Sequence, residues 1–337
     1  MTTSPKKIGI VGTGAIAGAY SLAFENTDKA VLVAAADIDP AAAHAYASKH
    51  DAKAFESLED MIDQAELDGV IISTPPVLHN QHVLACAEKG LHIMCEKPVS
   101  VDSENAMQMI ESAKQNQVLF TMASKFRFVE DIAKAKKLVE QGVIGDLVLF
   151  ENAFTSNVDM TKRWNSNPAI SGGGVLIDNG THSLDIMRYF LGTLVRVKAV
   201  ECQRIQDIVV DDTVRVFVET ECGVVGNIDL SWSINKELPT FVSLFGSEGT
   251  LHVGWQQSKY KRTGDKDWTV FGTGYDKVAA FKNQIENFVD AMDGKAKLVV
   301  QPEDALASVH AVEAAYESMR TSNWQMIGKT SETSPVL

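Results

Sequence analysis

Hydrophobic and polar positions alternate regularly over about the first third of the chain. Short apolar runs rich in β-branched residues are separated by longer stretches rich in Ala, Leu, Glu and Lys. Strands that are apolar on both faces and alternate with helices indicate a parallel sheet covered by helices. The short runs predict strands at Ile8–Val11, Val31–Ala36, Gly69–Ser73, His92–Cys95 and Val118–Met122. The longer stretches predict helices at Ala15–Glu25, Pro40–His50, Leu58–Gln64, Val77–Lys89 and Asp102–Asn116. Residues 1–123 are therefore expected to form a doubly wound α/β domain.

The pattern changes after a helix expected at Val129–Gln141. Strands then follow one another with few helices between them, which favours an α+β domain with a mostly antiparallel, open sheet over residues 124–337. Gly223 supplies the turn of a hairpin between two of these strands. The expected strands are Leu147–Asn157, Leu194–Arg204, Asp212–Glu221, Val224–Ser233, Thr240–Phe245 and Thr250–Gln256, and the closing helices are Lys277–Met292 and Pro302–Ser322. The pattern leaves open whether these last helices pack back on the first domain.

Charge and hydropathy exclude two classes of partner. The 337 residues include 44 acidic and 31 basic ones, a net charge of −13, which disfavours binding to the phosphate backbone of nucleic acid. No apolar run approaches the ~20 residues that cross a bilayer, so no membrane span is expected. Lys6 and Lys7 precede a stretch interrupted by glycines, unlike the apolar core of a signal peptide, and a cytoplasmic protein is expected.

The cysteines carry no metal or redox motif. None of Cys86, Cys95, Cys202 and Cys222 stands at the spacing of a zinc ribbon or a dithiol pair. They are interpreted as ordinary buried thiols in a reducing compartment.

A glycine-rich turn follows the first expected strand and opens the first helix. Its G-x-G-x-x-A pattern places Gly12 at the tight turn, Gly14 where a pyrophosphate would approach the backbone, and Ala17 where helix and strand pack closely. The free N–H groups of the helix would then face the phosphates. The candidate cofactor-binding residues here are Gly12, Gly14, Ala15 and Ile16.

A carboxylate stands at the end of the second strand, about 20 residues after this turn, where dinucleotide-binding domains bind a ribose. Asp37 there would accept hydrogen bonds from the ribose hydroxyls and repel the additional phosphate of NADP. The following Ile38, Asp39 and Pro40 offer no cation, so NAD is expected rather than NADP. The alternative is that Asp37 only caps the next helix.

Two further motifs carry chemistry. Glu96-Lys97-Pro98 follows a strand of the parallel sheet, at the edge where such folds bind ligands. Gly172–Gly174 precede a segment that, if helical, places Asp178, His182 and Asp185 on one face. The three glycines are expected to allow the backbone to approach a ligand closely.

Together these motifs resemble the glucose–fructose oxidoreductase/inositol dehydrogenase (Gfo/Idh/MocA) family. The similarity rests on the glycine turn, Thr74-Pro75-Pro76 with His79, the Glu96-Lys97-Pro98 triplet, Phe126-Arg127-Phe128 and the stretch from Gly172 to Asp185, in the order of the family. It implies a Rossmann domain for NAD followed by a substrate-binding domain whose open sheet forms homodimers or homotetramers. It also implies hydride transfer between NAD and a secondary hydroxyl or ketone of a sugar, inositol or related polyol.

The resemblance also assigns roles to residues. It makes Lys97, Asp178 and His182 catalytic and places Thr74, Pro75, His79 and Glu96 at the dinucleotide. Arg127, Trp164 and Asn165 join the catalytic three as substrate-binding candidates, although Arg163-Trp164 reverses the order of the family's Trp-Arg pair.

General acid–base chemistry fits these assignments. A histidine has an ordinary pKa of ~6.5, which suits a base that takes the hydroxyl proton. Asp178 would then hold the tautomer of His182 or a substrate hydroxyl, and Lys97 would stabilise the developing alkoxide. Which of Lys97 and His182 takes the proton first stays open.

Structural interpretations of the same residues remain. Lys97 can be a solvated turn residue, His182 a core histidine with Asp178 as its partner, and Asp185 a supporting or solvated carboxylate. His79 and His82 have no further ligand at zinc spacing, so no metal is expected.

Two other functions remain open. One is an enzyme that recycles NAD during elimination or glycoside cleavage. The other is a regulator that binds a dinucleotide without catalysis, for which a base opposite the nicotinamide would be of no use.

Overall fold

The computed structural model describes residues 4–328, so residues 1–3 and 329–337 of the two expected domains lie outside it. The described chain forms two compact units. Unit 1 contains residues 4–133 and 276–306, and unit 2 contains residues 134–275 and 307–328.

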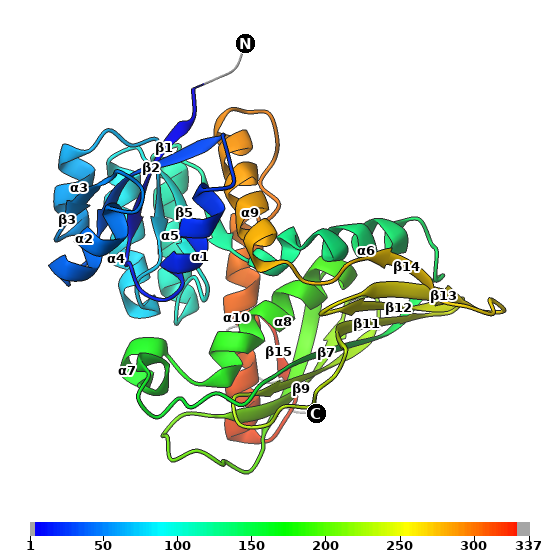
Figure 1. Ribbon diagram of the computed structural model, residues 1–337. Coiled ribbons are helices and arrows are strands. Elements are labelled where there is room, and N and C mark those ends of the chain that lie inside the picture. Colours follow the sequence, from blue (N-terminus) through cyan, green and yellow to red (C-terminus); the bar gives the residue numbers. More distant parts are fainter. Residues whose placement is uncertain (1–3, 329–337) are drawn as a thin grey trace. The chain divides into compact units, whose positions relative to one another are not determined.

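A six-stranded sheet with entirely parallel strand pairs forms the centre of unit 1 (Figure 1). Its strand order is β3-β2-β1-β4-β5-β6, so the direction of winding reverses between β1 and β4. In doubly wound sheets the ligand binds beyond the carboxyl ends of the strands at such a switch point. The strands are β1 (Lys6–Val11), β2 (Ala30–Ala36), β3 (Lys53–Phe55), β4 (Gly69–Ile72), β5 (His92–Glu96) and β6 (Phe120–Ala123).

Helices cover this sheet and close its core. The helices are α1 (Ala17–Phe24), α2 (Pro40–Ala47), α3 (Leu58–Gln64), α4 (His79–Glu88), α5 (Ser103–Gln115) and α9 (Lys277–Met292), with 3₁₀ turns at Pro76–Leu78 and Lys125–Phe128. Tyr20 of α1 packs edge-on against Phe281 of α9, with 4.8 Å between the ring centroids. Both side chains are fully buried, so the late helix α9 completes the core around α1.

Unit 2 is built on a nine-stranded sheet of order β14-β13-β12-β11-β7-β10-β9-β8-β15. Its pairs are antiparallel except for β7 and β10, which run parallel. Gly223, with a φ of +82°, turns the chain between β9 and β10, as expected for the hairpin. The strands are β7 (Leu147–Thr155), β8 (Leu194–Glu201), β9 (Thr213–Thr220), β10 (Val225–Ser231), β11 (Thr240–Gly246), β12 (Gly249–Gly254), β13 (Ser258–Arg262), β14 (Thr269–Gly272) and β15 (Gln325–Met326).

One long helix of unit 2, α8 (Val175–Leu191), packs against β7, β9 and β10. The contact is close because Gly226 of β10 leaves room for Met187: a Cβ at Gly226 would lie 2.7 Å from the terminal methyl of Met187. The remaining helical segments are α6 (Glu130–Glu140), the 3₁₀ turn Trp164–Ser166, α7 (Pro168–Ser171) and α10 (Pro302–Thr321).

The predicted fold class is confirmed: a doubly wound parallel sheet is followed by a mostly antiparallel one. The prediction missed β3, β13, β14 and β15. β3 has three residues, β14 has four and β15 has two, and β13 is the polar segment Ser-Lys-Tyr-Lys-Arg, so each of them is too short or too polar for a clear strand pattern.

Two further expectations concern the surface of the molecule. No helix within residues 4–328 has the length and apolar composition of a membrane span. The expectation of buried thiols is correct for Cys86 and Cys95 and wrong for Cys202 and Cys222, which are exposed.

Candidate dinucleotide and catalytic sites

The glycine turn joins β1 to α1 at the switch point of the parallel sheet. Gly12 has a φ of +87°, and a Cβ there would lie 2.8 Å from backbone atoms of Ser73 and Thr74. Its N–H donates to the carbonyl oxygen of Ala36 at 2.8 Å. The turn is therefore tied to the ends of β2 and β4 in a conformation that favours glycine.

Open space lies beside Gly14. A Cβ built at this exposed residue would meet no protein atom within 4 Å. The next residues lead into α1, whose N-cap Ile16 makes no capping hydrogen bond through its side chain. Uncapped N–H groups at a helix start and an open approach to a glycine backbone are the features that bind a pyrophosphate. The turn thus fits the expected dinucleotide.

Asp37, directly after β2, reaches across to this turn. One carboxylate oxygen, Oδ2, accepts from Thr13 N at 2.7 Å and from Thr13 Oγ1 at 3.0 Å, and the other accepts from Asp39 N at 3.0 Å. The N-cap of α2 is Asp39, whose side chain accepts from Ala41 N. The alternative that Asp37 serves as a helix cap is therefore wrong, and its half-buried carboxylate lies at the glycine turn.

His79 links two loops at the carboxyl end of the same sheet. Its Nε2 lies 2.8 Å from the carbonyl oxygen of Thr74, and its Nδ1 lies 3.0 Å from that of Pro98 and 3.2 Å from that of Val99. The ring has no exposed surface, and burial lowers the pKa of His79 to about 4. The imidazole thus links the Thr74-Pro75 turn to the segment after Lys97, and both of its ring nitrogens contact backbone carbonyl groups of the protein.

Glu96, the last residue of β5, is also buried. Its Oε1 accepts from the hydroxyl of Tyr20 at 2.8 Å, and its Oε2 accepts from the backbone N of Lys97 at 3.1 Å. Gln284 donates to the Tyr20 hydroxyl at 3.2 Å. Burial raises the pKa of the Glu96 carboxyl above its ordinary value. These contacts fix the backbone from which the half-buried side chain of Lys97 projects.

Arg127, expected to bind substrate, is buried in unit 1. Its Nη1 donates to Asp304 Oδ2 at 3.0 Å and to the carbonyl oxygen of Val299 at 3.2 Å. The side chain of Arg127 is 4% exposed and that of Asp304 17%. Through these contacts the guanidinium joins the 3₁₀ turn after β6 to the first turn of α10 and to the segment that precedes it.

The expected helix with the catalytic candidates of unit 2 is α8. Asp178 lies in its first turn and is half-buried, while His182 lies one turn later and is 6% exposed. Phe154 of β7 lies edge-on to the His182 ring, with 6.5 Å between the centroids. Asp185 is completely buried, so it is not a solvated carboxylate. The helix brings a carboxylate and an imidazole together on one face, as predicted.

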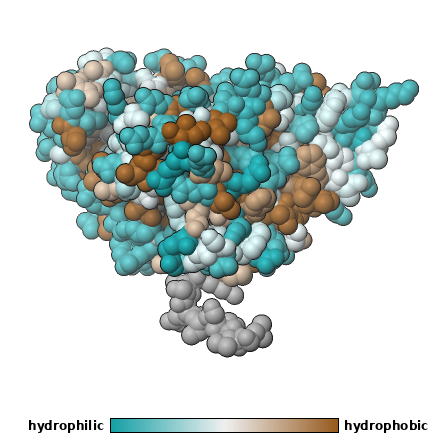
Figure 2. Space-filling view, turned by 90° about the horizontal axis from the view of Figure 1, so that it is seen from below, coloured by the Kyte–Doolittle hydropathy of each residue, from teal (hydrophilic) through white to brown (hydrophobic). Residues whose placement is uncertain are grey.

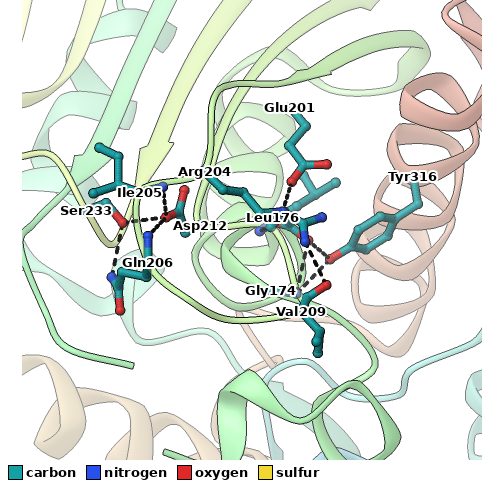
Figure 3. Close-up of polar contacts among 11 residues, drawn as sticks. Gly174, Leu176, Glu201, Arg204, Ile205, Gln206, Val209, Asp212, Ser233 and Tyr316 are labelled. Carbon is teal, nitrogen blue, oxygen red and sulfur yellow. Dashed lines mark hydrogen bonds and ion pairs between the residues drawn. The ribbon is translucent and has the colours of Figure 1, made fainter. Parts of the chain in front are cut away.

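The glycine run before α8 serves protein contacts. A Cβ at Gly173 would lie 2.1 Å from the hydroxyl oxygen of Tyr316, and one at Gly174 would lie 2.0 Å from the carbonyl oxygen of Asp211. The expectation that these glycines leave space for a ligand is therefore wrong at these two positions. Figure 3 shows the Tyr316 side chain reaching from α10 toward the start of α8 at Gly174 and Leu176. The sequence does not identify Asp211 and Tyr316, because no local motif indicates that these two residues contact the start of α8.

Trp164 and Asn165 lie in the short 3₁₀ turn Trp164–Ser166 of unit 2. Trp164 is 45% exposed, and Asn165 is half-buried. Asn167 caps the following α7 by accepting from Ala169 N at 3.1 Å. The exposed indole is thus available to a ligand from solvent.

The predicted site residues are divided between the two units. Unit 1 holds the dinucleotide candidates and Lys97 at the carboxyl end of its parallel sheet, and unit 2 holds Asp178 and His182 on α8. No group of three or more His, Cys, Asp or Glu side chains within residues 4–328 is arranged to bind a metal ion.

Comparisons with known proteins agree with this arrangement. Residues 6–124 match the family model described as "Oxidoreductase family, NAD-binding Rossmann fold", and residues 132–252 match "GFO/IDH/MocA C-terminal domain". The rhizopine catabolism protein MocA of Rhizobium meliloti is 28% identical over 92% of this chain and 94% of its own length. Inositol 2-dehydrogenase of Rhizobium meliloti (strain 1021) is 27% identical over 93% of this chain and 96% of its own length.

A solved structure has the same fold. The complex of levoglucosan dehydrogenase with NADH and levoglucosan superposes with a TM-score of 0.90 at 22% identity, covering 96% of this chain and 99% of that one. The matched family description names NAD, so the predicted cofactor is confirmed.

Proposed function

The chain belongs to the Gfo/Idh/MocA family of oxidoreductases, and from that membership we propose that it oxidises a secondary hydroxyl of a sugar, inositol or related polyol with NAD, or reduces the corresponding ketone. The observation that carries the proposal is the pairing of Asp178 and His182 on one face of α8, in a chain whose glycine turn leaves space beside Gly14. Bound NAD supplies the hydride acceptor. Relatives that are named as inositol or sugar dehydrogenases support this class of substrate.

The residues of this chain then have distinct tasks. We assign to His182 the role of the base that accepts the proton of the substrate hydroxyl, because an imidazole is the side chain whose ordinary pKa lies nearest neutrality. Asp178, one turn earlier, orients the imidazole or holds a second hydroxyl. Lys97 donates a hydrogen bond to the reacting oxygen, where negative charge develops. Glu96 and His79 hold the loop that carries Lys97.

The cofactor form follows from Asp37. Its carboxylate lies at the glycine turn with Ile38 almost fully exposed beside it, and the next residues bring no cation. A second negative charge on the ribose would be repelled there. We therefore assign the preference for NAD over NADP to Asp37.

Two finer points belong to the same proposal. The sheet of unit 2 exposes apolar side chains at neighbouring positions of β7 and β10, with Leu149 47% and Val225 37% exposed. Figure 2 shows hydrophobic areas among hydrophilic ones on one face of the molecule. The exposed apolar positions of β7 and β10 suit a homodimer or homotetramer formed through the sheet. The exposed thiols of Cys202 and Cys222 suit the reducing cytoplasm.

The test measures NADH formation at 340 nm against a panel of inositols, aldoses and polyols, with NAD and NADP compared. Lys97→Ala and His182→Ala should each lower kcat about 10²–10⁴-fold while NAD still binds. Unchanged turnover in both variants would refute the assignment. Product formation without net NADH would indicate the NAD-recycling alternative. Light scattering during gel filtration decides the oligomeric state.

A further inference from the structure

The first turn of α8 lacks a capping side chain of its own. Its N-cap residue is Gly174, and the first N–H groups of a helix need acceptors from elsewhere. Asp211, in the segment between β8 and β9, provides them. Its Oδ1 accepts from Gly174 N at 3.1 Å, its Oδ2 from Leu176 N at 2.8 Å, and its carbonyl oxygen from Val175 N at 2.8 Å. One residue thus holds three successive amides, those of the N-cap and of the first two residues of α8.

Tyr316 completes this arrangement from α10. Its hydroxyl donates to Asp211 Oδ1 at 3.0 Å and accepts from Gly174 N at 3.1 Å. Asp211 is 4% exposed, so water does not compete for its oxygens. The glycines at 173 and 174 let the backbone come so close to Tyr316 and Asp211 that a Cβ at either position would overlap with them.

The first turn of α8, which Asp211 and Tyr316 hold, contains Asp178, one of the residues proposed to act in the reaction. Asp178 N donates to the carbonyl oxygen of Gly174 at 3.1 Å, so Asp178 belongs to the first hydrogen-bonded turn. His182 follows one turn later. Because a helix moves as a rigid body, a shift of its first turn moves both side chains relative to a substrate. Misplacement by about 1 Å can cost about 10²-fold in rate.

We propose that Asp211 and Tyr316 are positioning residues, which fix the first turn of α8 and thereby set the positions of Asp178 and His182. This assignment rests on the proposed function, because it is the proposed reaction that needs these two side chains in place. It differs from that function in naming residues that touch neither the hydroxyl nor the nicotinamide.

The neighbouring Asp212 offers a matched control. Its Oδ2 accepts from Ile205 N and Gln206 N, each at 2.9 Å, and from Ser233 Oγ at 2.8 Å (Figure 3). The side chain of Asp212 thus accepts three hydrogen bonds, as does that of Asp211, but from the loop before β9 and from the residue Ser233 after β10, and none from α8. Asp212→Asn therefore tests a general loosening of unit 2.

The kinetic experiment compares Asp211→Asn, Tyr316→Phe and Asp212→Asn with the wild-type enzyme. Asp211→Asn should lower kcat about 10–100-fold with a much smaller change of KM and no change in NAD affinity. Tyr316→Phe, which keeps the ring and removes two hydrogen bonds, should lower kcat in the same sense by a smaller factor. Asp212→Asn should keep kcat near the wild-type value. An equal loss in Asp212→Asn, or full activity in Asp211→Asn, overturns the proposal.

Hydrogen–deuterium exchange separates this inference from the proposed function. Amides of residues 174–178 should exchange faster in Asp211→Asn and Tyr316→Phe, with the rate in Asp212→Asn unchanged. If the wild-type protein oxidises none of the tested hydroxyl compounds, the proposed function is refuted. The exchange rates then still show whether Asp211 and Tyr316 hold the first turn of α8. Unchanged exchange in both variants overturns the positioning role. Tyr316→Phe keeps the test decisive if Asp211→Asn fails to fold.

Discussion

Adding one methyl group at Gly14 should separate NAD binding from folding. A Cβ at this position meets no protein atom within 4 Å, and the residue is exposed, so Gly14→Ala should fold at least as stably as the wild-type protein. The same Cβ would occupy the space where the pyrophosphate approaches the backbone. Hydrogen bonds to a charged group contribute about 1.5–3 kcal/mol, so the loss of one should weaken NAD binding about 10–100-fold.

Thermal unfolding with and without NAD measures this effect. At a concentration of about 100 times the wild-type Kd, NAD stabilises the wild-type fold by about 2.7 kcal/mol, and a variant that binds 100-fold more weakly gains only about 0.4 kcal/mol. For a unit the size of unit 1 these energies correspond to shifts in Tm of roughly 5–10 °C and 1–2 °C. Isothermal titration with NAD gives the Kd directly.

Two neighbouring glycines are matched controls. Gly18 lies in α1, and a Cβ there also meets nothing within 4 Å, so Gly18→Ala should gain about 0.5–1 kcal/mol of stability and keep its NAD affinity. At Gly12, a Cβ would lie 2.8 Å from the backbone at Ser73 and Thr74, so Gly12→Ala should lose about 2–4 kcal/mol. A Gly14→Ala protein that binds NAD as tightly as the wild type would refute the placement of the pyrophosphate at this turn.

Three further changes test particular side chains. Asp37→Ser should raise the ratio of NADP to NAD affinity at least about tenfold, because the carboxylate that repels the additional phosphate is gone; an unchanged ratio in titrations with both cofactors contradicts this. Arg127→Ala should lower the free energy of unfolding by about 3–5 kcal/mol, because it leaves the partly buried Asp304 without this ion-pair partner. Wild-type stability together with a raised KM would instead indicate that Arg127 binds substrate. Burial raises the pKa of Asp211 from 3.8 to about 6, so the folded protein binds this proton more tightly, and the contribution of Asp211 to stability should fall by roughly 3 kcal/mol as the pH rises from about 4 to about 6. The difference between the urea unfolding free energies of wild type and Asp211→Asn across that range measures it, and a constant difference excludes it.

Local patterns were sufficient for most of the architecture. The strands of the parallel sheet are apolar on both faces, and the strand before Gly12 and the helix after it are adjacent in sequence, so both the sheet and the glycine turn could be predicted. The helical spacing of Asp178 and His182 required only that the segment be helical. By contrast, β3 and β15 form because neighbouring strands offer them hydrogen-bond partners, a property of the tertiary structure that three or two residues cannot encode.

The site was harder to predict where a residue acts through distant partners. Arg127 has the chemistry of a substrate-binding residue, and only the fold shows Asp304, far along the chain, beside its guanidinium. His79 occurs in a motif associated with the dinucleotide, yet both ring nitrogens face backbone carbonyl groups. In each case the residue type indicated polar contacts, and the sequence contained no sign of the contacts with distant groups of the protein that the structure shows.

The glycines show why this ambiguity is physical. A glycine in a sequence motif indicates that a side chain is not tolerated at that position. It does not indicate whether a ligand or the protein itself occupies the space that a side chain would need. At Gly14 the space is open toward solvent, as a cofactor requires, while at Gly174 it is filled by the carbonyl oxygen of Asp211. The two uses have opposite consequences for a methyl group: at Gly14 it competes with a ligand and leaves the fold intact, and at Gly174 it displaces the start of α8. Comparing the stability and the NAD affinity of the two alanine variants therefore distinguishes a glycine that binds from a glycine that packs.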